Sequence, residues 1–239
     1  MGNTVNTKIG AIILSRYNSA RLPGKALIKI AGKEALGYIY ERLLCVMAPE
    51  DIVVATSEEK DDQAIVDYCA ARKMNYFRGP KDNVAQRFLL CGQQFHFDHL
   101  VRICGDNVLV DHRLLKRMIE IALKGEYDLV SNAKDRTFPA GMSIEIVKRS
   151  FYERIIQQIM SKEDQEHVTS YLYKRENLGK YFFVYNEDCP RMKGVKLALD
   201  DAADLHFLTK IITAMEKDHC SYLLKDIERL MDRFKICRS

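Results

Sequence analysis

Residues 9–25 read IGAIILSRYNSARLPGK, and this segment gives the clearest indication of the fold class. Ile9–Leu14 is an unbroken apolar run, whereas residues 15–25 are mostly polar and contain Pro23 and Gly24. A short apolar run that ends at a turn is typical of a fully buried strand in a parallel sheet. We therefore predict an internal strand at Ile9–Leu14 and a functional loop directly after it.

The same pattern recurs as strands alternating with helices. Further strands are expected at residues 51–56, 76–78, 100–104 and 128–131. Helices are expected between them, at residues 35–47, 61–72, 83–95 and 111–124. This alternation predicts right-handed βαβ units, and so a parallel or mostly parallel sheet that is covered on both faces.

The alternation breaks after Asn132. Strands are then expected at residues 142–148, 181–185 and 195–199, followed by two terminal helices at residues 203–215 and 222–234. The fold class predicted is α/β: a Rossmann-like, mostly parallel sheet flanked by helices, with a small mixed-strand insertion. We expect one domain over residues 1–239, with residues 132–199 containing the strand-rich insertion.

Composition excludes several classes of protein. The chain has 239 residues, is 47% apolar, and carries 37 Lys and Arg against 33 Asp and Glu. That apolar content supports a sizeable core, and a net charge of +4 does not indicate a nucleic-acid partner. No apolar stretch reaches the roughly 18 residues of a membrane span, and the first twenty residues lack a secretory pattern. Seven scattered cysteines without CxxC spacing are typical of reduced thiols, so we expect a cytoplasmic protein.

Positive charge is concentrated in the loop after the first strand. Residues 1–33 contain no Asp or Glu, and Arg16, Arg21 and Lys25 follow the strand. Ligands of open α/β sheets bind beyond the carboxyl ends of the strands, where such cations suit a polyphosphate. The GxxxxGK[ST] and GxGxxG motifs are absent, which excludes the two commonest nucleotide-binding loops in their usual form.

The segment RYNSARLPGK at residues 16–25 resembles the signature of the CTP-dependent sugar-acid cytidylyltransferases. This family includes CMP-Kdo synthetase, CMP-sialic acid synthetase and a spore-coat-polysaccharide-type branch. Further matches span residues 9–212 and favour the spore-coat branch: IVVATS at 52–57, FRG at 77–79, VRICGD at 101–106, SN at 131–132, RTFPAG at 136–141, EHVT at 166–169 and LD at 199–200.

The resemblance implies a reaction. A sugar hydroxyl attacks the α-phosphate of CTP, pyrophosphate leaves, and a CMP-sugar forms. Such an in-line displacement needs positively charged groups beside the leaving pyrophosphate. Arg16, Arg21 and Lys25 are expected to supply them as catalytic residues. The expected nucleotide-binding residues are Leu14, Ser15, Arg16, Lys25, Gly79, Arg87 and Arg102, with the backbone of Leu14 and Ser15 reading cytosine. Arg102 either faces the ligand or pairs with an Asp.

Asp106 and Asp200 are expected to hold Mg²⁺, because the resemblance places metal ligands there and hard carboxylate oxygens suit this ion. Each Asp has an alternative role as the cap of the following helix, although Asp111 stands closer than Asp106 to its helix. Strand ends of one parallel sheet open onto a shared crevice, so the two carboxylates should face one another. Without metal, their repulsion should raise at least one pKa.

The resemblance places the sugar-acid site near residues 136–141 and 166–167. The expected substrate-binding residues are Arg136, Thr137, Gly141, Glu145, Glu166 and His167. Arg136 in such a loop can form two parallel hydrogen bonds with a substrate carboxylate. His167 either contacts sugar hydroxyls or is a residue of the helix surface or of the packing. Asn83, Gln86 and Val108 depart from the usual family residues, so the acceptor stays open.

Other classes of protein compete with this prediction. A GT-A glycosyltransferase would need a DxD motif at a strand end, and the acidic pairs Asp61-Asp62 and Asp200-Asp201 are not DxD. A non-sugar or phosphorylated acceptor, or a non-catalytic nucleotide sensor, are further alternatives. The partners expected are CTP, a small acidic acceptor and a second copy of the chain, with a homodimer forming through residues 132–199.

Overall fold

In the computed structural model, which describes residues 7–237, β1 (Ile9–Leu14) lies inside a seven-stranded sheet. It pairs in parallel with β4 (Ile52–Ser57) on one side and with β6 (His99–Cys104) on the other. Ala11, Ile12 and Ile13 are fully buried, as a strand covered on both faces requires. The predicted strand is confirmed with its exact bounds.

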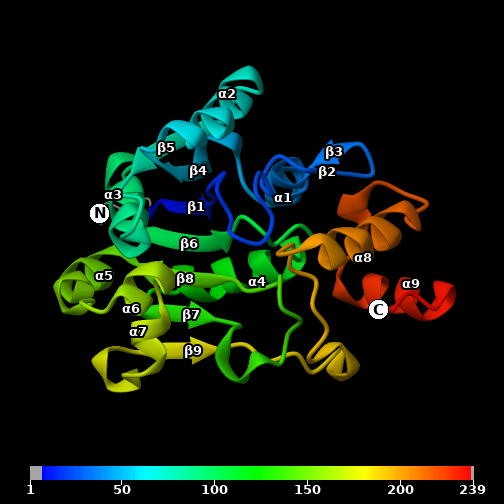
Figure 1. Ribbon diagram of the computed structural model, residues 1–239. Coiled ribbons are helices and arrows are strands. Elements are labelled where there is room, and N and C mark those ends of the chain that lie inside the picture. The colour runs from blue at the N-terminus through cyan, green and yellow to red at the C-terminus, as the bar shows by residue number, and fades with distance from the viewer. Residues whose placement is uncertain (1–6, 238–239) are drawn as a thin grey trace.

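The strand order is β5-β4-β1-β6-β8-β7-β9 (Figure 1). β5 (Asn75–Gly79) extends the sheet beyond β4, while β7 (Leu129–Ser131) and β9 (Tyr181–Phe183) form the opposite end. β8 (Glu145–Lys148) pairs antiparallel with both β6 and β7, and β7 pairs in parallel with β9. The predicted mostly parallel sheet is therefore confirmed. A separate hairpin joins β2 (Lys29–Ile30) to β3 (Lys33–Glu34).

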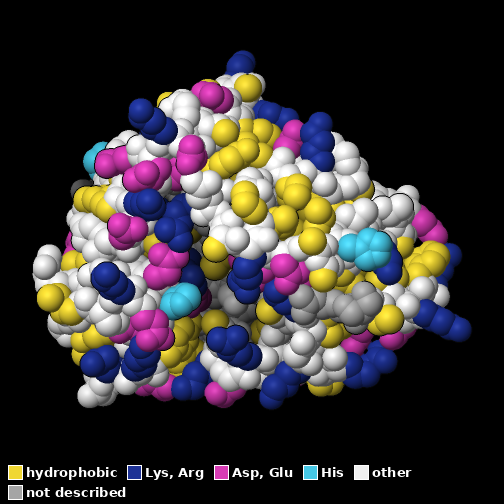
Figure 2. All heavy atoms as spheres, in the orientation of Figure 1, with side chains coloured by type: hydrophobic (Ala, Val, Ile, Leu, Met, Phe, Trp, Pro, Cys, Tyr) yellow, Lys and Arg dark blue, Asp and Glu magenta, His cyan; other side chains and the backbone are white. Residues whose placement is uncertain are grey.

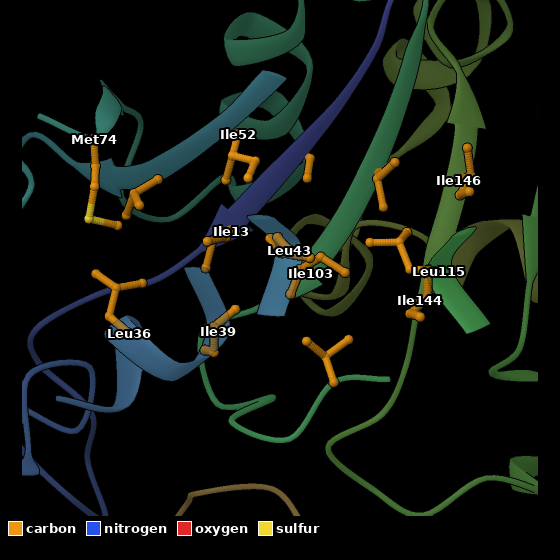
Figure 3. Packing of buried hydrophobic residues seen from close by; sticks show 14 of the residues in the cluster. Ile13, Leu36, Ile39, Leu43, Ile52, Met74, Ile103, Leu115, Ile144 and Ile146 are labelled. Carbon is orange, nitrogen blue, oxygen red and sulfur yellow. The ribbon is translucent and has the colours of Figure 1, made fainter. Parts of the chain in front are cut away.

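Helices cover both faces of the sheet. One apolar cluster joins the sheet to α1 (Ala35–Leu44), α2 (Gln63–Ala71) and α4 (His112–Leu123) (Figure 3). A second joins it to α3 (Val84–Gln94), α5 (Arg149–Ile155) and α7 (Ser170–Tyr173), with α6 (Lys162–His167) packed on α3. No helix within residues 7–237 is both long enough and apolar enough to cross a membrane.

Residues 132–199 differ in part from the sequence prediction. β8 and β9 form, and both extend the main sheet, but the short helices α5, α6 and α7 were not predicted. They have seven, six and four residues, too few for a helical period to stand out in the sequence. The strand predicted at residues 195–199 is wrong. Within residues 7–237 that segment belongs to neither sheet and forms one isolated bridge, between Ala140 and Lys196.

A third apolar cluster holds the C-terminal helices. α8 (Ala202–Thr213) and α9 (Leu224–Phe234) pack on the buried Leu197 and Leu199, to the right of the sheet in Figure 1. Arg42 of α1 ties this region to the sheet domain: its guanidinium is fully buried and donates to the carbonyls of Val110, His219 and Tyr222 at 2.5–2.6 Å.

We expect Arg42→Met to lower the free energy of unfolding by about 3 kcal/mol, because each buried acceptor left without a donor costs about 1–3 kcal/mol. Urea denaturation measures the change. Arg229→Met is the control, because Arg229 is 68% exposed and, among residues 7–237, forms an ion pair only with Asp226 of the same helix. Equal stability of both variants would contradict the structural role of Arg42.

Candidate active site

A pocket of about 360 Å³ opens at the carboxyl ends of β1 and β6. It is visible in Figure 2 as a hollow that contains Lys and Arg side chains and has carboxylates at its rim. Its lining comes from the loop after β1 (Leu14, Ser15, Arg16, Asn18, Ser19, Ala20, Arg21, Lys25), from α3 (Val84, Arg87), from β6 and its loop (Arg102, Cys104, Gly105, Asp106) and from α6 (Glu166, His167).

A buried carboxylate fixes the start of the basic loop. Asp62 accepts hydrogen bonds from the backbone of Tyr17 at 2.6 Å and from the backbone and hydroxyl of Ser57 at 2.7 and 2.5 Å. Burial acts to raise the pKa of Asp62, but these hydrogen bonds outweigh it and lower the pKa. The sequence prediction did not assign Asp62 this role; its place just beyond the end of β4 was the available signal.

The loop then turns back so that Lys25 faces the pocket. The backbone N–H of Gly24 donates to the carbonyl of Tyr17 at 2.8 Å, and Gly24 has φ +71°, a value that favours glycine. The backbone of Leu14 and Ser15 is already engaged, since Ser15 donates to Ala55 and Leu14 accepts from Gly105. Leu14 and Ser15 both line the pocket. The expected contact of their backbone with cytosine stays a prediction, because these hydrogen bonds engage only the Ser15 N–H and one lone pair of the Leu14 carbonyl.

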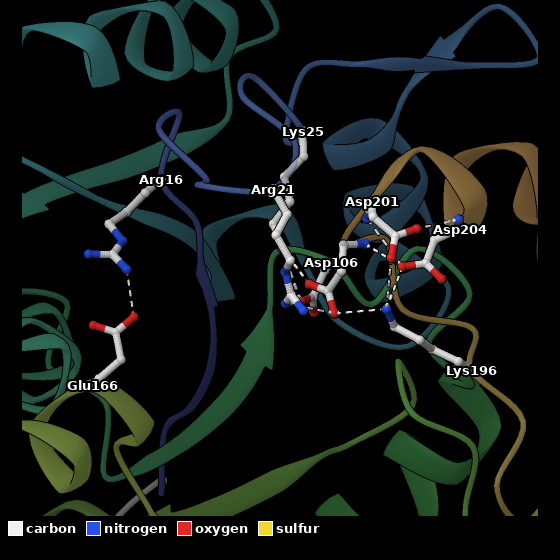
Figure 4. A network of polar contacts seen from close by, with 9 residues as sticks. Arg16, Arg21, Lys25, Asp106, Glu166, Lys196, Asp201 and Asp204 are labelled. Carbon is white, nitrogen blue, oxygen red and sulfur yellow. Dashed lines mark hydrogen bonds and ion pairs between the residues drawn. The ribbon is translucent and has the colours of Figure 1, made fainter.

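Lys25 joins the two predicted metal carboxylates. Its Nζ lies 3.2 Å from Oδ2 of Asp106 and 3.0 Å from Oδ1 of Asp200 (Figure 4). The expectation that these carboxylates face one another is confirmed. Asp200 is not the cap of α8, because the neighbouring Asp201 accepts from the backbone of Asp204 and forms that cap.

The pKa expectation fails for Asp200. Burial acts to raise the pKa of this carboxyl, but hydrogen bonds and charge from Lys25 and Lys196 outweigh burial and lower it. The sequence reasoning considered repulsion between Asp106 and Asp200 alone, whereas the fold places ammonium groups beside them.

Lys196 and Asp204 complete the cluster, and the sequence prediction named neither. Nζ of Lys196 lies 3.2 Å from Oδ2 of Asp200 and 2.5 Å from Oδ2 of the buried Asp204. Asp204 also accepts from the backbone N–H groups of Asp200 and Asp201 at 3.0 and 3.2 Å. The spacing of four residues between Lys196 and Asp200 was the only sequence signal. A spacing of four residues brings two side chains together in a helix, and because this segment is not helical, the spacing did not predict the contact.

Two further cations lie on the α3 and α6 side of the pocket. Arg16 pairs with Glu166 at 2.5 Å, which links the loop after β1 to α6 (Figure 4). Arg87 is buried and donates to the carbonyls of Pro80 and Lys81 at 2.6 and 3.2 Å. Burial lowers the pKa of Arg87 to about 10, a shift that still leaves it charged at neutral pH. Gly79 ends β5 and does not belong to the lining.

Arg102 pairs with a carboxylate while also lining the pocket, but its partner is Glu145 rather than an Asp. Glu145 is only 2% exposed and accepts further hydrogen bonds from Thr169 at 2.6 Å and Tyr173 at 2.5 Å. Glu145 thus lies beneath the pocket. A buried carboxylate with three donors orients Arg102 and has no surface left for a substrate, which corrects its predicted binding role.

The other predicted substrate residues divide into two groups. Glu166 and His167 line the pocket, whereas Arg136, Thr137 and Gly141 do not. Thr137 accepts from the backbone of Asn186 at 3.1 Å. Gly141 has φ +94°, and a Cβ there would lie 2.4–2.6 Å from the backbone of Leu197 and Ala198. Gly141 is therefore a packing residue that lets Leu197 and Ala198 pass close to the backbone of residue 141, which corrects its predicted contact with substrate.

The sheet order, together with cations and paired carboxylates at one edge, defines the class as a Rossmann-like nucleotidyltransferase fold. The family model for cytidylyltransferases matches residues 10–224. The chain therefore belongs to the cytidylyltransferase family, whose members are CTP-dependent nucleotidyltransferases. The family resemblance carried by residues 16–25 is confirmed.

Three known proteins illustrate the similarity. The spore coat polysaccharide biosynthesis protein SpsF of Bacillus subtilis is 28% identical over 200 residues, covering 81% of both chains. The structure of a cytidylyltransferase from Leptospira borgpetersenii is 27% identical, with a TM-score of 0.90 and 98% of both chains covered. The structure of CMP:2-keto-3-deoxy-manno-octonic acid synthetase complexed with CTP has a TM-score of 0.65 at 17% identity, covering 87% of this chain and 99% of that one. This last likeness concerns the fold.

We expect Gly141→Ala to cost about 2–4 kcal/mol of stability, since strain at positive φ and overpacking add. Gly125→Ala is the control: its φ is +75°, but a Cβ there meets nothing within 4 Å, so only the conformational cost remains. Urea denaturation of both variants separates the two contributions. Similar losses in the two variants would show that the contact with Leu197 and Ala198 does not constrain residue 141.

Proposed function

We propose that this protein transfers CMP from CTP to a hydroxyl of a sugar acid of the ulosonic or nonulosonic type and releases pyrophosphate. The observation that carries the proposal is the convergence of Lys25, Asp106 and Asp200 at the edge of a pocket rich in arginine. Two similarities support it: a relative is a spore coat polysaccharide biosynthesis protein, and a protein with this fold was solved with CTP. The product would serve surface polysaccharide or glycoconjugate synthesis.

The charged side chains fit the needs of phosphoryl transfer. Arg16, Arg21 and Lys25 line the pocket, where they can neutralise the triphosphate and stabilise the charge that develops on leaving pyrophosphate. Arg21 is 66% exposed, so its side chain is free to turn toward a nucleotide. Arg87 and Arg102 are held rigidly by carbonyls and by Glu145, which suits them to orient the nucleotide rather than to move with it.

Asp106 and Asp200 fit a divalent cation, because both present carboxylate oxygens to one point, now contacted by the ammonium of Lys25. Bound there, Mg²⁺ would neutralise phosphate oxygens and polarise the α-phosphate for attack. Lys196 would hold Asp200 in place through its contacts with Asp200 and Asp204.

The acceptor side of the site is assigned to α6. Glu166 and His167 line the pocket opposite the basic loop, and both carry groups that hydrogen-bond sugar hydroxyls. Glu166 is 41% exposed and pairs with Arg16, so a nucleotide that draws Arg16 away would leave the Glu166 carboxylate available to the acceptor.

We expect the protein with CTP, Mg²⁺ and a suitable 2-keto sugar acid to release pyrophosphate, and Lys25→Ala to lower kcat by about 10²–10³-fold, as loss of a transition-state charge does. Coupled detection of pyrophosphate measures the rate with each nucleotide and acid. Lys29→Ala is the control, because Lys29 is exposed on the hairpin after the loop. Equal turnover of wild type and Lys25→Ala would refute the role of Lys25, and release only with phosphorylated acceptors would refute the sugar-acid assignment.

We also propose a homodimer formed through residues 132–199. Among the described residues, β9 pairs with β7 on one side only, and Tyr185 just beyond it is 42% exposed. Light scattering should give twice the chain mass of 27.6 kDa at micromolar concentration. Tyr185→Lys should weaken the dimer, while Tyr76→Lys, on the opposite edge strand, should not. A monomer mass for the wild type would overturn the proposal.

A further inference from the structure

We infer that Lys25 and a divalent cation compete for the same position between Asp106 and Asp200. The ammonium of Lys25 holds the two carboxylates together when no metal ion is bound, and it turns to the nucleotide phosphates only when a metal ion takes its place. The inference rests on the proposed function and adds a regulatory role for Lys25. It means that nucleotide binding through Lys25 depends on metal.

The contacts of Lys25 are the first step. Its Nζ is within 3.2 Å of one oxygen of each carboxylate, and its side chain is only 18% exposed. A lysine ammonium is a compact point charge with three donors, so it can occupy a cation position between two carboxylates. Because Lys25 also lines the pocket, the same side chain has the nucleotide site within reach.

The charge balance of the cluster is the second step. Asp200 lies within 3.3 Å of three cations, Arg21, Lys25 and Lys196. Lys25 is the cation that also contacts Asp106, at 3.2 Å, so its ammonium bridges the two carboxylates. If Lys25 turned away with no replacement, Asp106 and Asp200 would face one another without the cation between them, and repulsion would oppose the movement.

The position of Lys196 decides which cation exchanges. Lys196 is held 2.5 Å from Asp204, whose side chain is fully buried, and it does not line the pocket. Lys25 lines the pocket, and its partners Asp106 and Asp200 are the carboxylates assigned to the metal. Lys196 thus stays with Asp200, and Lys25 is the cation that leaves.

Linkage gives two measurable consequences. A ligand that must displace Lys25 binds more tightly when Lys25 is absent, so Lys25 weakens the binding of metal alone. By the same reasoning, Lys25 contributes to CTP binding only after it has been released from the carboxylates. Both effects express one coupling free energy between the metal and nucleotide positions, which is reciprocal.

The first experiment measures the binding of Mn²⁺ alone to the full-length protein by electron paramagnetic resonance. Lys25→Met should bind Mn²⁺ at least about tenfold more tightly than wild type, because a competing charge next to both carboxylates is removed. Lys29→Met, the matched control, should bind as wild type does. Adding Asp106→Asn to Lys25→Met should abolish the gain. Unchanged or weaker binding by Lys25→Met would overturn the inference.

The second experiment measures CTP affinity by calorimetry, with EDTA and with Mg²⁺. Lys25→Met should change CTP affinity less than about threefold in EDTA but weaken it more than about tenfold in Mg²⁺, since Lys25 is free to contact phosphate only with metal present. Equal weakening in both conditions would overturn the inference and leave the proposed function intact. Failure of the wild type to bind CTP would refute the proposed function, while the Mn²⁺ experiment would still test Lys25.

Thermal melting of each variant confirms that it is folded. Lys25→Gln, which retains a polar head group without the charge, repeats both measurements if Lys25→Met unfolds. A gain in Mn²⁺ affinity in Lys25→Gln supports the exchange, and its absence contradicts it.

Discussion

Parallel pairing of β1 with β4 and β6 brings the basic loop after β1 and Asp106 after β6 to one edge of the sheet. Because the three strands point the same way, the loops that follow them meet at one edge of the sheet. Asp62, after β4, holds the loop after β1 through the backbone of Tyr17. Gly105, after β6, lies so close to Ser15 and Leu14 that a Cβ would approach them to 2.7–2.9 Å. The pocket exists because these loops are held at this spacing.

The second contribution to the site comes from far along the chain. Asp200 reaches Lys25, which is 175 positions away in sequence, on an extended segment that is supported from both sides. Gly141 allows this segment to approach the sheet, and the apolar side chains of Leu197 and Leu199 anchor it beneath α8 and α9. The C-terminal helices therefore support the candidate site indirectly, because they pack on the segment that carries Asp200.

Charge is balanced differently on the two sides of the pocket. On one side Glu145 is buried and holds Arg102 through a contact that also involves Thr169 and Tyr173, so this cation is rigid. On the other side Lys25 lies between Asp106 and Asp200, and in our proposal this cation exchanges with a metal ion. Rigid cations suit orientation of the nucleotide, and exchangeable ones suit a step in which charge moves to the leaving group.

Sequence patterns alone predicted the seven strands of the main sheet and the family, together with a strand at residues 195–199 that does not form. Both signals are local. An apolar run followed by RYNSARLPGK can be recognised within a few residues, and the alternation of strands and helices is visible in a single sequence because each type of element has its own pattern of apolar residues. The sequence also predicted that Asp106 and Asp200 approach one another, and in the structure both contact the ammonium of Lys25. Most contacts between charged side chains became visible only in the folded chain. Three findings depend on contacts between distant segments: the burial of Glu145, the contact of Lys196 with Asp200, and the packing role of Gly141. Contacts between segments so far apart produce no periodic pattern in the sequence.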